Sequence, residues 1–258
     1  MDDRRLTYFI SDLHLGAAHI DSDRRRERLV CRFLDSITPT ARRLYLLGDI
    51  LDYWFEYKTV APRGYLRFFG TLARMADAGV EIIWFKGNHD IWLFDYLRDE
   101  IGITVIDGSE SVTIDGSRFL LSHGDGLGRL KPSFRFIRSL FRNRFCQKLY
   151  SGIHPRWTIP FAHAWSADSR KSGTADISYE RDIAPSVEPW AREYAAAHPD
   201  TGYIVIGHHH VMVDKLVGDH TRLIILGDWI SNFSYGVFDG KNFELKQYAS
   251  ALRDFNNK

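Results

Sequence analysis

Five short motifs, each expected to follow a β-strand, constrain the possible folds of this chain most strongly. Apolar, β-prone runs at residues 6–11, 43–47 and 80–85 end in potential metal ligands, and segments with helical spacing at 24–37 and 64–78 separate them. Because the carboxyl ends of parallel strands gather at one edge of a sheet, ligands from distant parts of a chain can meet there. The motifs are Asp12-Leu13-His14, Gly48-Asp49, Gly87-Asn88-His89-Asp90, His123-Gly124-Asp125 and Gly207-His208-His209-His210.

A second group of strands is expected after residue 103. Short β-prone segments separated by Asp-Gly turns lie at 104–106, 111–114 and 119–122, and five more lie between residues 203 and 248. Together with the two helices, this order predicts an α/β (α+β) fold in which two mixed sheets pack as a sandwich flanked by helices. Residues 1–258 are expected to form one domain.

The composition excludes several classes of protein. The net charge of +1 over 258 residues is not that of a nucleic-acid-binding or an acidic chain, and no apolar run reaches the length of a membrane span. Cys31 and Cys146 lie far apart, which argues against a secreted disulfide scaffold. The start of the chain runs directly into a ligand-bearing strand, so a cleavable signal peptide is not expected. These features predict a cytoplasmic protein.

A basic insertion interrupts the strands. Residues 129–171 contain ten lysine and arginine residues against one acid, Asp168. Helical spacing predicts an apolar face beside a basic stripe, and the place of the segment between two ligand motifs predicts a helical cap over the site. Such a surface suits an anionic lipid or membrane, and the alternative is a solvated helix face. The apolar face comprises Phe134, Ile137, Phe141, Phe145 and Leu149, and the stripe Lys131, Arg135, Arg138 and Arg142.

The ligand types indicate a paired metal site. Carboxylates, imidazoles and an amide together suit two divalent transition ions better than one structural zinc. Asp49 is the best candidate for a bridging carboxylate. Asp12 and His14 lie two residues apart and would share one ion in an extended segment, as would His208 and His210. Because paired ions promote in-line displacement at phosphorus, the motifs predict a hydrolase of phosphate esters or anhydrides.

In order and spacing, the five motifs resemble those of the calcineurin-like metallophosphoesterase superfamily (DxH, GDxxD, GNHD/E, HGD and GHxH). The resemblance implies that two ions bind, with manganese favoured and iron or zinc as alternatives. It implies that His89 faces the phosphoryl group or the leaving group and that Asp90 orients the His89 ring. Asp52 and Asp125 are expected to support the ligands or to form turns, and not to bind an ion directly. The first ion would be held by Asp12, His14, Asp49 and His210, and the second by Asp49, Asn88, His123 and His208.

Longer segments resemble a narrower group, the UDP-2,3-diacylglucosamine pyrophosphohydrolases of lipid A biosynthesis. The similar segments begin at Ser11, Gly48 and Gly87, and the basic insertion is also shared. In two places the chain departs from the better-known branch, with His89 in place of arginine and His209 in place of threonine. The resemblance implies cleavage to UMP and 2,3-diacylglucosamine 1-phosphate at the inner membrane of a Gram-negative bacterium. It also implies that Ser166, Ser169, Arg170 and Lys171 contact substrate phosphates.

Two other functions remain open at this point. A phosphodiesterase, nuclease or phosphatase of the same fold would use the basic cap to bind its substrate, for example a nucleic-acid backbone. However, the aromatic residues of the insertion follow a helical stripe and are not spread as stacking platforms, so no stable nucleic-acid partner is expected. A non-catalytic binding module would be expected to lack some ligands, and all seven are present.

Overall fold

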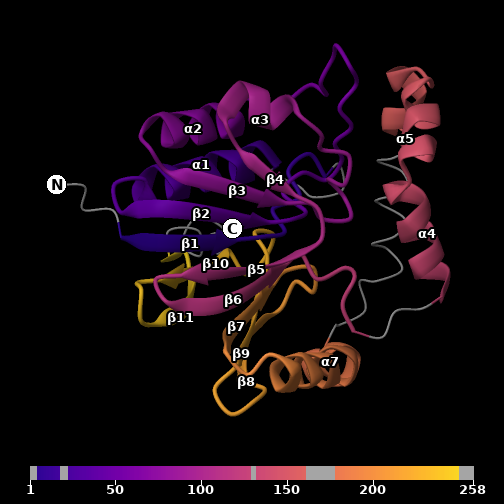
Figure 1. Cartoon of the computed structure of the whole chain (residues 1–258). Helices are drawn as coiled ribbons and strands as arrows, with labels where there is room; N and C mark the ends of the chain where they lie inside the picture. Colours follow the sequence, from indigo (N-terminus) through magenta and orange to yellow (C-terminus); the bar gives the residue numbers. More distant parts are fainter. Residues whose placement is uncertain (1–4, 18–22, 129–131, 161–177, 250–258) are drawn as a thin grey trace.

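The computed structural model describes residues 5–17, 23–128, 132–160 and 178–249. Its centre is a six-stranded sheet, in which the four strands nearest the start of the chain run parallel and the last two are antiparallel (Figure 1). The first three strands each end just before a ligand motif. In spatial order the strands are β11 (Phe243–Gln247), β10 (Ser234–Phe238), β1 (Leu6–Ile10), β2 (Ala41–Leu47), β3 (Glu81–Phe85) and β4 (Thr104–Ile106).

A second sheet of five strands packs against the first. Its three central strands are parallel, and an antiparallel strand lies at each edge. This sheet provides the other two ligand motifs, at the carboxyl ends of β6 and β7. In spatial order the strands are β5 (Ser109–Ile114), β6 (Ser117–Ser122), β7 (Thr201–Ile206), β9 (Arg222–Leu226) and β8 (Met212–Leu216).

The central strands of both sheets carry nearly continuous apolar runs, as expected for strands with two buried faces. Phe9 and Leu47 from the first sheet meet Phe119 and Leu121 from the second between the sheets, and the Phe9 and Phe119 rings stack at 5.9 Å. The predicted sandwich of two mixed sheets is therefore confirmed.

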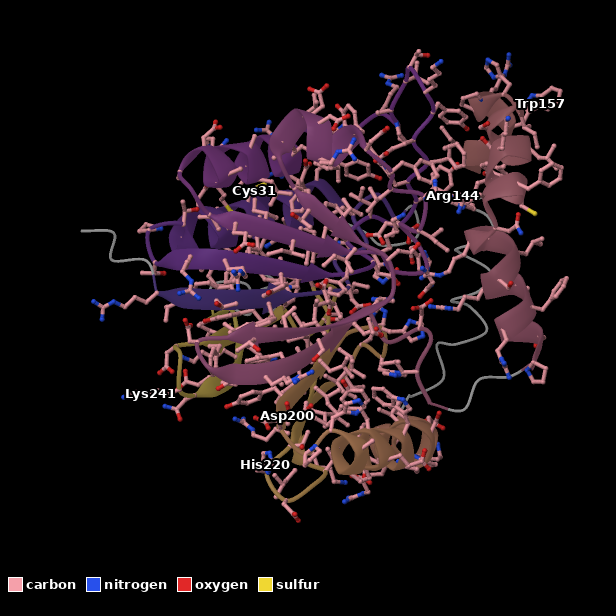
Figure 2. The ribbon with its side chains drawn as sticks, in the orientation of Figure 1. Cys31, Arg144, Trp157, Asp200, His220 and Lys241 are labelled. Carbon is pink, nitrogen blue, oxygen red and sulfur yellow. The ribbon has the colours of Figure 1, made fainter. Side chains whose placement is uncertain are left out.

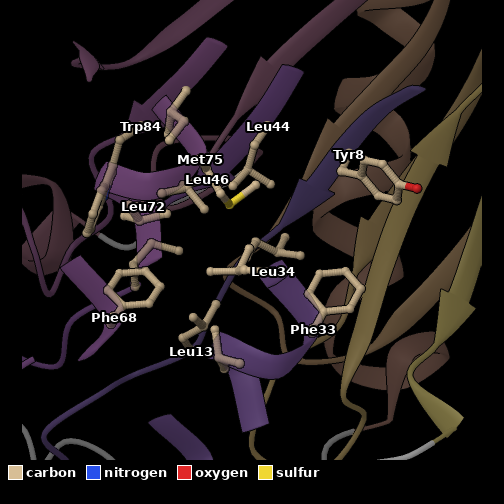
Figure 3. Packing of buried hydrophobic residues seen from close by; sticks show 14 of the residues in the cluster. Tyr8, Leu13, Phe33, Leu34, Leu44, Leu46, Phe68, Leu72, Met75 and Trp84 are labelled. Carbon is tan, nitrogen blue, oxygen red and sulfur yellow. The ribbon is translucent and has the colours of Figure 1, made fainter. Parts of the chain in front are cut away.

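Helices cover the outer faces of the sandwich. Helices α1 (Asp23–Ile37) and α2 (Leu66–Asp77) place residues such as Phe33 and Phe68 against the outward-facing Leu44 and Trp84 of the first sheet (Figure 3). The second sheet is covered by α7 (Ala184–Ala197), which follows a short π-helical turn, η1 (Tyr179–Ile183). Burial of these large apolar surfaces holds the strand ends, and so the ligand loops, in fixed positions.

Two of these helices were not among the expected elements. Helix α3 (Tyr96–Ile101) is only six residues long, and α7 contains Pro189 in its interior. Short length and an internal proline both weaken the sequence signal for a helix. At the start of α3, the backbone N–H groups of residues 94–96 donate hydrogen bonds to the buried carboxylate of Glu56, which is distant in sequence. This contact replaces a local helix cap.

The basic insertion is helical, as predicted, but it consists of two helices, and its apolar face is not continuous. Helix α4 (Pro132–Arg142) ends before Asn143, whose side chain accepts hydrogen bonds from two backbone N–H groups at the start of α5 (Arg144–Ser151). Phe141 packs on Trp92 with ring centroids 5.6 Å apart, whereas Phe145 is 68% exposed. Of the expected stripe, Phe141 therefore packs on the body of the protein, whereas Phe145 faces solvent beyond the break between the two helices.

A different apolar surface results. Large apolar side chains are exposed along α4, α5 and the segment that follows, and Figure 2 shows Trp157 at the end of the insertion distant from α4. Among the residues that the structure describes, no helix has both the length and the apolar character needed to cross a bilayer. The exposed apolar surface of the insertion comprises Phe136, Leu140, Phe145, Leu149, Ile153 and Trp157.

Candidate metal centre

The five motifs converge where loops from both sheets meet. Asp12 follows β1, Asp49 follows β2 and Asn88 follows β3, while His123 and His208 follow strands of the second sheet. Backbone hydrogen bonds join the loops, from residue 12 N to residue 48 O at 3.1 Å and from residue 207 N to residue 123 O at 2.9 Å. The expected clustering of all five motifs is therefore observed.

The first group of ligand atoms comes from Asp12, His14 and His210. Asp12 Oδ1 lies 3.5 Å from His210 Nε2 and 3.8 Å from His14 Nε2, and the two imidazole nitrogens are 3.3 Å apart. Protein ligands about 2.0–2.2 Å from a common divalent ion lie roughly 3–3.5 Å from each other, and the observed separations are close to this range. These three side chains can therefore share one ion.

The second group lies beside it. His123 Nε2 is 3.3 Å from Asp49 Oδ2 and 3.2 Å from Asn88 Oδ1. His208 belongs to the same group, because it has a ligand atom within 4.8 Å of ligand atoms of Asp49 and His123. Asp49 Oδ2 is also 3.7 Å from His14 Nε2. The same carboxylate oxygen therefore faces both groups, which is the arrangement that a bridging ligand requires.

A bound metal ion would also provide a partner for a buried carboxylate oxygen that otherwise has none. Asp12 Oδ1 is buried and has no hydrogen-bond partner among the described residues, although an unpaired buried carboxylate oxygen is costly. Its neighbours are imidazole nitrogens at distances too long for good hydrogen bonds. The donor set of carboxylate, imidazole and amide, with no thiolate, fits divalent transition ions.

The remaining polar atoms of the ligands are held by the protein. Asp12 Oδ2 accepts a hydrogen bond from His208 N at 2.9 Å, and Asp49 Oδ1 accepts one from His89 N at 2.8 Å. His123 Nδ1 donates to the Leu47 carbonyl at 2.8 Å, which leaves Nε2 directed at the centre. Such contacts orient ligands before an ion binds.

The local backbone differs from the extended geometry expected at the first and last motifs. Of the eight non-glycine residues with positive φ among the described residues, five are proposed ligands. Asp12 and His14 therefore point to one centre through left-handed turns and not through strand alternation. Positive φ is strained for these residues, and such strain concentrates at functional sites. The five are Asp12, His14, Asp49, His208 and His210.

Close loop contact also explains a glycine in the third motif. A Cβ atom on Gly87 would lie 2.1 Å from Asp49 Oδ1 and 2.4 Å from the Asp49 backbone nitrogen. Any side chain at this position would push the β2 and β3 loops apart. The glycine that precedes Asn88 is thus required for the second and third motifs to reach the same ion.

The charge of the centre is stabilised by its imidazoles. Burial alone would raise the pKa of Asp12, but the neighbouring imidazoles of His14, His210 and His123 lower it to about 2. Burial likewise opposes ionisation of Asp49, and the neighbouring His123 and other histidines bring its pKa well below the ordinary value. Both carboxylates are therefore anionic at neutral pH and ready to bind cations.

Asp90 has a different role from the one expected. Its carboxylate accepts hydrogen bonds from Gly87 N at 2.7 Å, Ile50 N at 2.9 Å and the Trp84 indole at 3.1 Å, with longer contacts from the N–H groups of residues 49 and 51. These bonds tie the β2 loop to the β3 loop. We predicted that Asp90 orients the His89 ring, but in the structure its carboxylate instead binds the backbone of two ligand loops.

The His89 ring instead contacts Asp52. His89 Nδ1 lies 3.1 Å from the Asp52 carbonyl oxygen and 3.5 Å from its carboxylate, which is also 3.5 Å from His14 Nδ1. Asp52 thus supports two imidazoles, as expected of a residue beside the ligands. Burial lowers the pKa of His89 to about 4. A ring nitrogen of His89 also lies within 4.8 Å of the potential metal-binding atoms of His14 and Asp49, so His89 is next to the proposed metal centre.

Comparison with known proteins identifies the family. The model of the calcineurin-like phosphoesterase family matches residues 6–212. The chain belongs to this family. A relative from Porphyromonas gingivalis, named UDP-2,3-diacylglucosamine hydrolase, is 40% identical over 94% of this chain and 97% of its own length. Relatives with the same name come from Ralstonia nicotianae (30% identity, 79% of this chain and 76% of the relative) and Nitrosococcus oceani (28%, 86% and 87%).

The family membership confirms the resemblance deduced from the motifs and the prediction of a metal-dependent phosphoesterase. The matched region includes all five motifs and ends just beyond His210. It also includes the basic insertion between the fourth and fifth motifs.

One residue of this phosphoesterase site was not predicted. Asp228 is buried, and its Oδ2 lies 3.2 Å from His210 Nδ1. Its Oδ1 accepts hydrogen bonds from three backbone N–H groups of residues 230–232, and the Asn232 side chain donates to the His210 carbonyl at 2.9 Å. The sequence did contain a pattern that could have identified Asp228, because Gly227-Asp228 follows β9 in the same way that Gly48-Asp49 follows β2.

The basic insertion contacts the ligand loops of the phosphoesterase. Arg138 Nε donates to Asp125 Oδ2 at 2.7 Å, and Arg142 pairs with Asp125 and with Asp107. The Trp92 indole donates to the Phe141 carbonyl at 3.0 Å. Two arginines of the expected outward basic stripe therefore face the body of the protein, because these acids attract them. The predicted substrate contacts Ser166, Ser169, Arg170 and Lys171, and also Lys131, lie outside the described residues.

Proposed function

We propose that this phosphoesterase hydrolyses the pyrophosphate bond of UDP-2,3-diacylglucosamine, releasing UMP and 2,3-diacylglucosamine 1-phosphate in lipid A biosynthesis. The observation that carries the reaction type is the Asp49 carboxylate, whose Oδ2 faces both ligand groups at 3.3 and 3.7 Å. The choice of substrate is supported by the P. gingivalis relative, which bears the name of this activity and aligns over nearly the whole chain.

The ligand set would hold two divalent ions, for which we propose manganese. When bound, such ions supply an activated water and neutralise the charge of the phosphoryl group. The protein contributes fixed ligands, because the outer atoms of Asp12, Asp49 and His123 are already hydrogen-bonded. Little reorganisation is then needed when the substrate arrives, which favours in-line attack.

His89 would contact the phosphoryl oxygens or the leaving group. Its Nδ1 donates to the Asp52 carbonyl, so Nε2 remains for the substrate, and it can donate only when the ring is protonated. The lowered pKa keeps the free ring neutral, while the negative charge of a bound pyrophosphate would favour the protonated form. Because the leaving group is a phosphate monoester, it needs little protonation. Stabilisation of charge is then the main contribution of His89.

The insertion at 129–171 would act as a cap that brings the protein to its lipid substrate. Its exposed apolar surface includes Phe136, Phe145 and Trp157, which are 69%, 68% and 72% exposed. Exposed basic residues, Lys148 and Arg156, lie in the same segment. Aromatic and cationic side chains together suit the interface of an anionic bilayer. We therefore propose peripheral binding at the cytoplasmic side of the inner membrane of a Gram-negative bacterium.

A substrate panel tests the function. Purified protein with added Mn²⁺ should be given UDP-2,3-diacylglucosamine, the model diester bis(p-nitrophenyl) phosphate and single-stranded DNA. Release of UMP from the lipid nucleotide, at a kcat/KM well above that for the other two, is the expected result. Preferential cleavage of DNA would favour the nuclease alternative, and preference for the model diester would favour a simpler phosphodiesterase. Zinc- and iron-loaded samples tested beside the manganese form decide the metal.

A further inference from the structure

The loop between β9 and β10, residues 227–233, holds two of the proposed ligands by their backbone. The Trp229 N–H donates to the carbonyl oxygen of Asp12 at 3.1 Å, and the Asn232 side-chain amide donates to the carbonyl oxygen of His210 at 2.9 Å. Both ligands belong to the first group. Within the described part of the chain, the β9–β10 loop makes no hydrogen bond to the ligands of the second group alone, which are Asn88, His123 and His208.

The two carbonyl groups belong to residues with an unusual backbone. Asp12 has a φ of 54° and His210 a φ of 56°, in the left-handed region that residues with a Cβ atom rarely adopt. A hydrogen bond to the carbonyl oxygen fixes the peptide plane that follows the residue. The residue then cannot relax to an ordinary conformation without losing that bond. The β9–β10 loop therefore keeps both ligands in their strained conformations.

His210 depends on this support more than its neighbours do. Its side chain is 32% exposed, whereas the side chains of Asp12 and His14 are at most 1% exposed. Close packing fixes a buried side chain, but a partly exposed ring is held mainly by its hydrogen bonds. Asp228 contacts the ring of His210, and Asn232 holds its backbone. His210 is thus the ligand of the first group whose position is set by the β9–β10 loop.

The loop is itself fastened to the end of the last strand. Strand β10 lies between β1 and β11 (Figure 1), so its first residues are beside the ends of both neighbours. The Gln247 side chain donates to the Asn232 carbonyl at 3.0 Å, and the Tyr248 N–H donates to the Phe233 carbonyl at 2.8 Å. A chain of contacts therefore runs from Gln247 through Asn232 to His210.

We propose that the β9–β10 loop retains the first ion, with Asn232 as a positioning residue that acts through the backbone of His210. Gln247, an exposed residue at the end of β11, supports Asn232 from outside the site. The inference rests on the proposed pair of ions, but it does not depend on the identity of the substrate. Because the loop contacts ligands of one group, a change in it alters the affinity for one ion and leaves the other unchanged.

Removal of the Asn232 amide provides the test. Asn232→Ala removes the donor to the His210 carbonyl and keeps the backbone contacts of residue 232. The matched control is Asn242→Ala, because the backbone N–H of Asn242 also donates to an aspartate, but in the turn at the opposite end of β10. Calorimetry measures Mn²⁺ binding, and electron paramagnetic resonance measures the spin-coupled signal of a manganese pair.

We expect Asn232→Ala to bind one of the two ions about tenfold more weakly than Asn242→Ala does, while the other ion binds as before. At equal Mn²⁺ the spin-coupled signal should be smaller in Asn232→Ala, because fewer molecules hold both ions. Equal affinities in the two variants, or an equal loss at both ions, would overturn the proposal.

A second pair of variants keeps the test decisive if Asn232→Ala does not fold. Gln247→Ala removes the donor to the Asn232 carbonyl, and its control is Glu244→Ala, which alters an exposed residue of the same strand. Gln247→Ala should weaken the same ion roughly threefold, as expected for the loss of one neutral hydrogen bond. Equal affinities in this pair would overturn the link between β11 and the ion.

The proposed function fails in a different way from this inference. If the unaltered protein does not cleave UDP-2,3-diacylglucosamine, the proposed substrate is wrong, and the metal titrations still decide the role of the loop. A single Mn²⁺ site in the unaltered protein would contradict the proposed pair of ions before any variant is compared.

Discussion

The contact between Asp228 and His210 leads to a sharp prediction about metal affinity. In the structure, Asp228 Oδ1 is held by three backbone N–H groups, and Oδ2 lies 3.2 Å from His210 Nδ1. The carboxylate can only accept at neutral pH, so Nδ1 must carry the proton and Nε2 presents its lone pair to the centre. Asp228 therefore selects the tautomer of His210 that can bind an ion.

Asp228→Asn should reverse this selection. The amide oxygen of asparagine can still accept from the loop N–H groups, which leaves the NH₂ group facing His210 Nδ1. That nitrogen must then accept, so the proton moves to Nε2 and the tautomer that binds metal is disfavoured. Loss of comparable contacts to metal-binding histidines typically costs 10–100-fold in affinity, or about 1.4–2.7 kcal/mol. We expect a decrease of this size for one of two ions.

Calorimetric titration with Mn²⁺ measures the effect directly. The matched control is Asp239→Asn, because Asp239 also accepts two backbone N–H bonds in a turn but is exposed and not hydrogen-bonded to a histidine. Denaturation of the metal-free proteins separates a loss of loop stability from a loss of affinity. Unchanged affinity at both ions in a folded Asp228→Asn protein would refute the tautomer argument.

Four further variants test the remaining assignments. Asp49→Ala should abolish turnover and reduce bound metal from about two ions per chain to about one or fewer, and full occupancy with retained turnover would contradict a bridging role. His89→Ala should lower kcat by roughly 10²–10⁴ while metal content stays close to normal; an unchanged rate would show that His89 is dispensable. Asp90→Ala should cost about 3 kcal/mol or more in urea denaturation, since it leaves several buried N–H donors unpaired, and normal stability would count against its contact with the two loops. Trp157→Ser should weaken sedimentation with anionic vesicles, whereas Leu66→Ser, which alters another exposed apolar residue outside the insertion, should not; equal effects would argue against the membrane surface.

The residues that converge at the proposed metal centre could be predicted because each is marked by local sequence. Asp12 and Asp49 stand directly after short apolar runs, and a strand followed by a polar turn can be recognised without knowledge of the rest of the fold. The strands that deliver them pack on both faces, so their apolar residues form nearly continuous runs. The same rule would have marked Asp228, which also follows a buried strand and a glycine.

The supporting contacts were less predictable because they depend on which loops meet. Asp90 and Glu56 each accept several backbone N–H bonds from segments about 40 residues away, and nothing in the adjacent sequence names those partners. The direction of the cap helices has the same origin. Arg138 and Arg142 turn inward because Asp125 and Asp107 lie opposite them, and helical spacing alone cannot distinguish this face from a solvated one.

These nonlocal contacts explain how one chain can join a fixed metal centre to the insertion that we propose to face lipid. The ligand loops are fixed by buried carboxylates, and the insertion is attached to the same loops through Asp125, through the Trp92–Phe141 contact and through a hydrogen bond between Tyr53 and Tyr150. All three attachments lie within about five residues of a proposed ligand on the body side. A substrate held by the insertion would therefore be held in a defined position relative to the two ions. This coupling predicts that changes in the insertion alter KM and the positioning of the pyrophosphate before they alter metal binding.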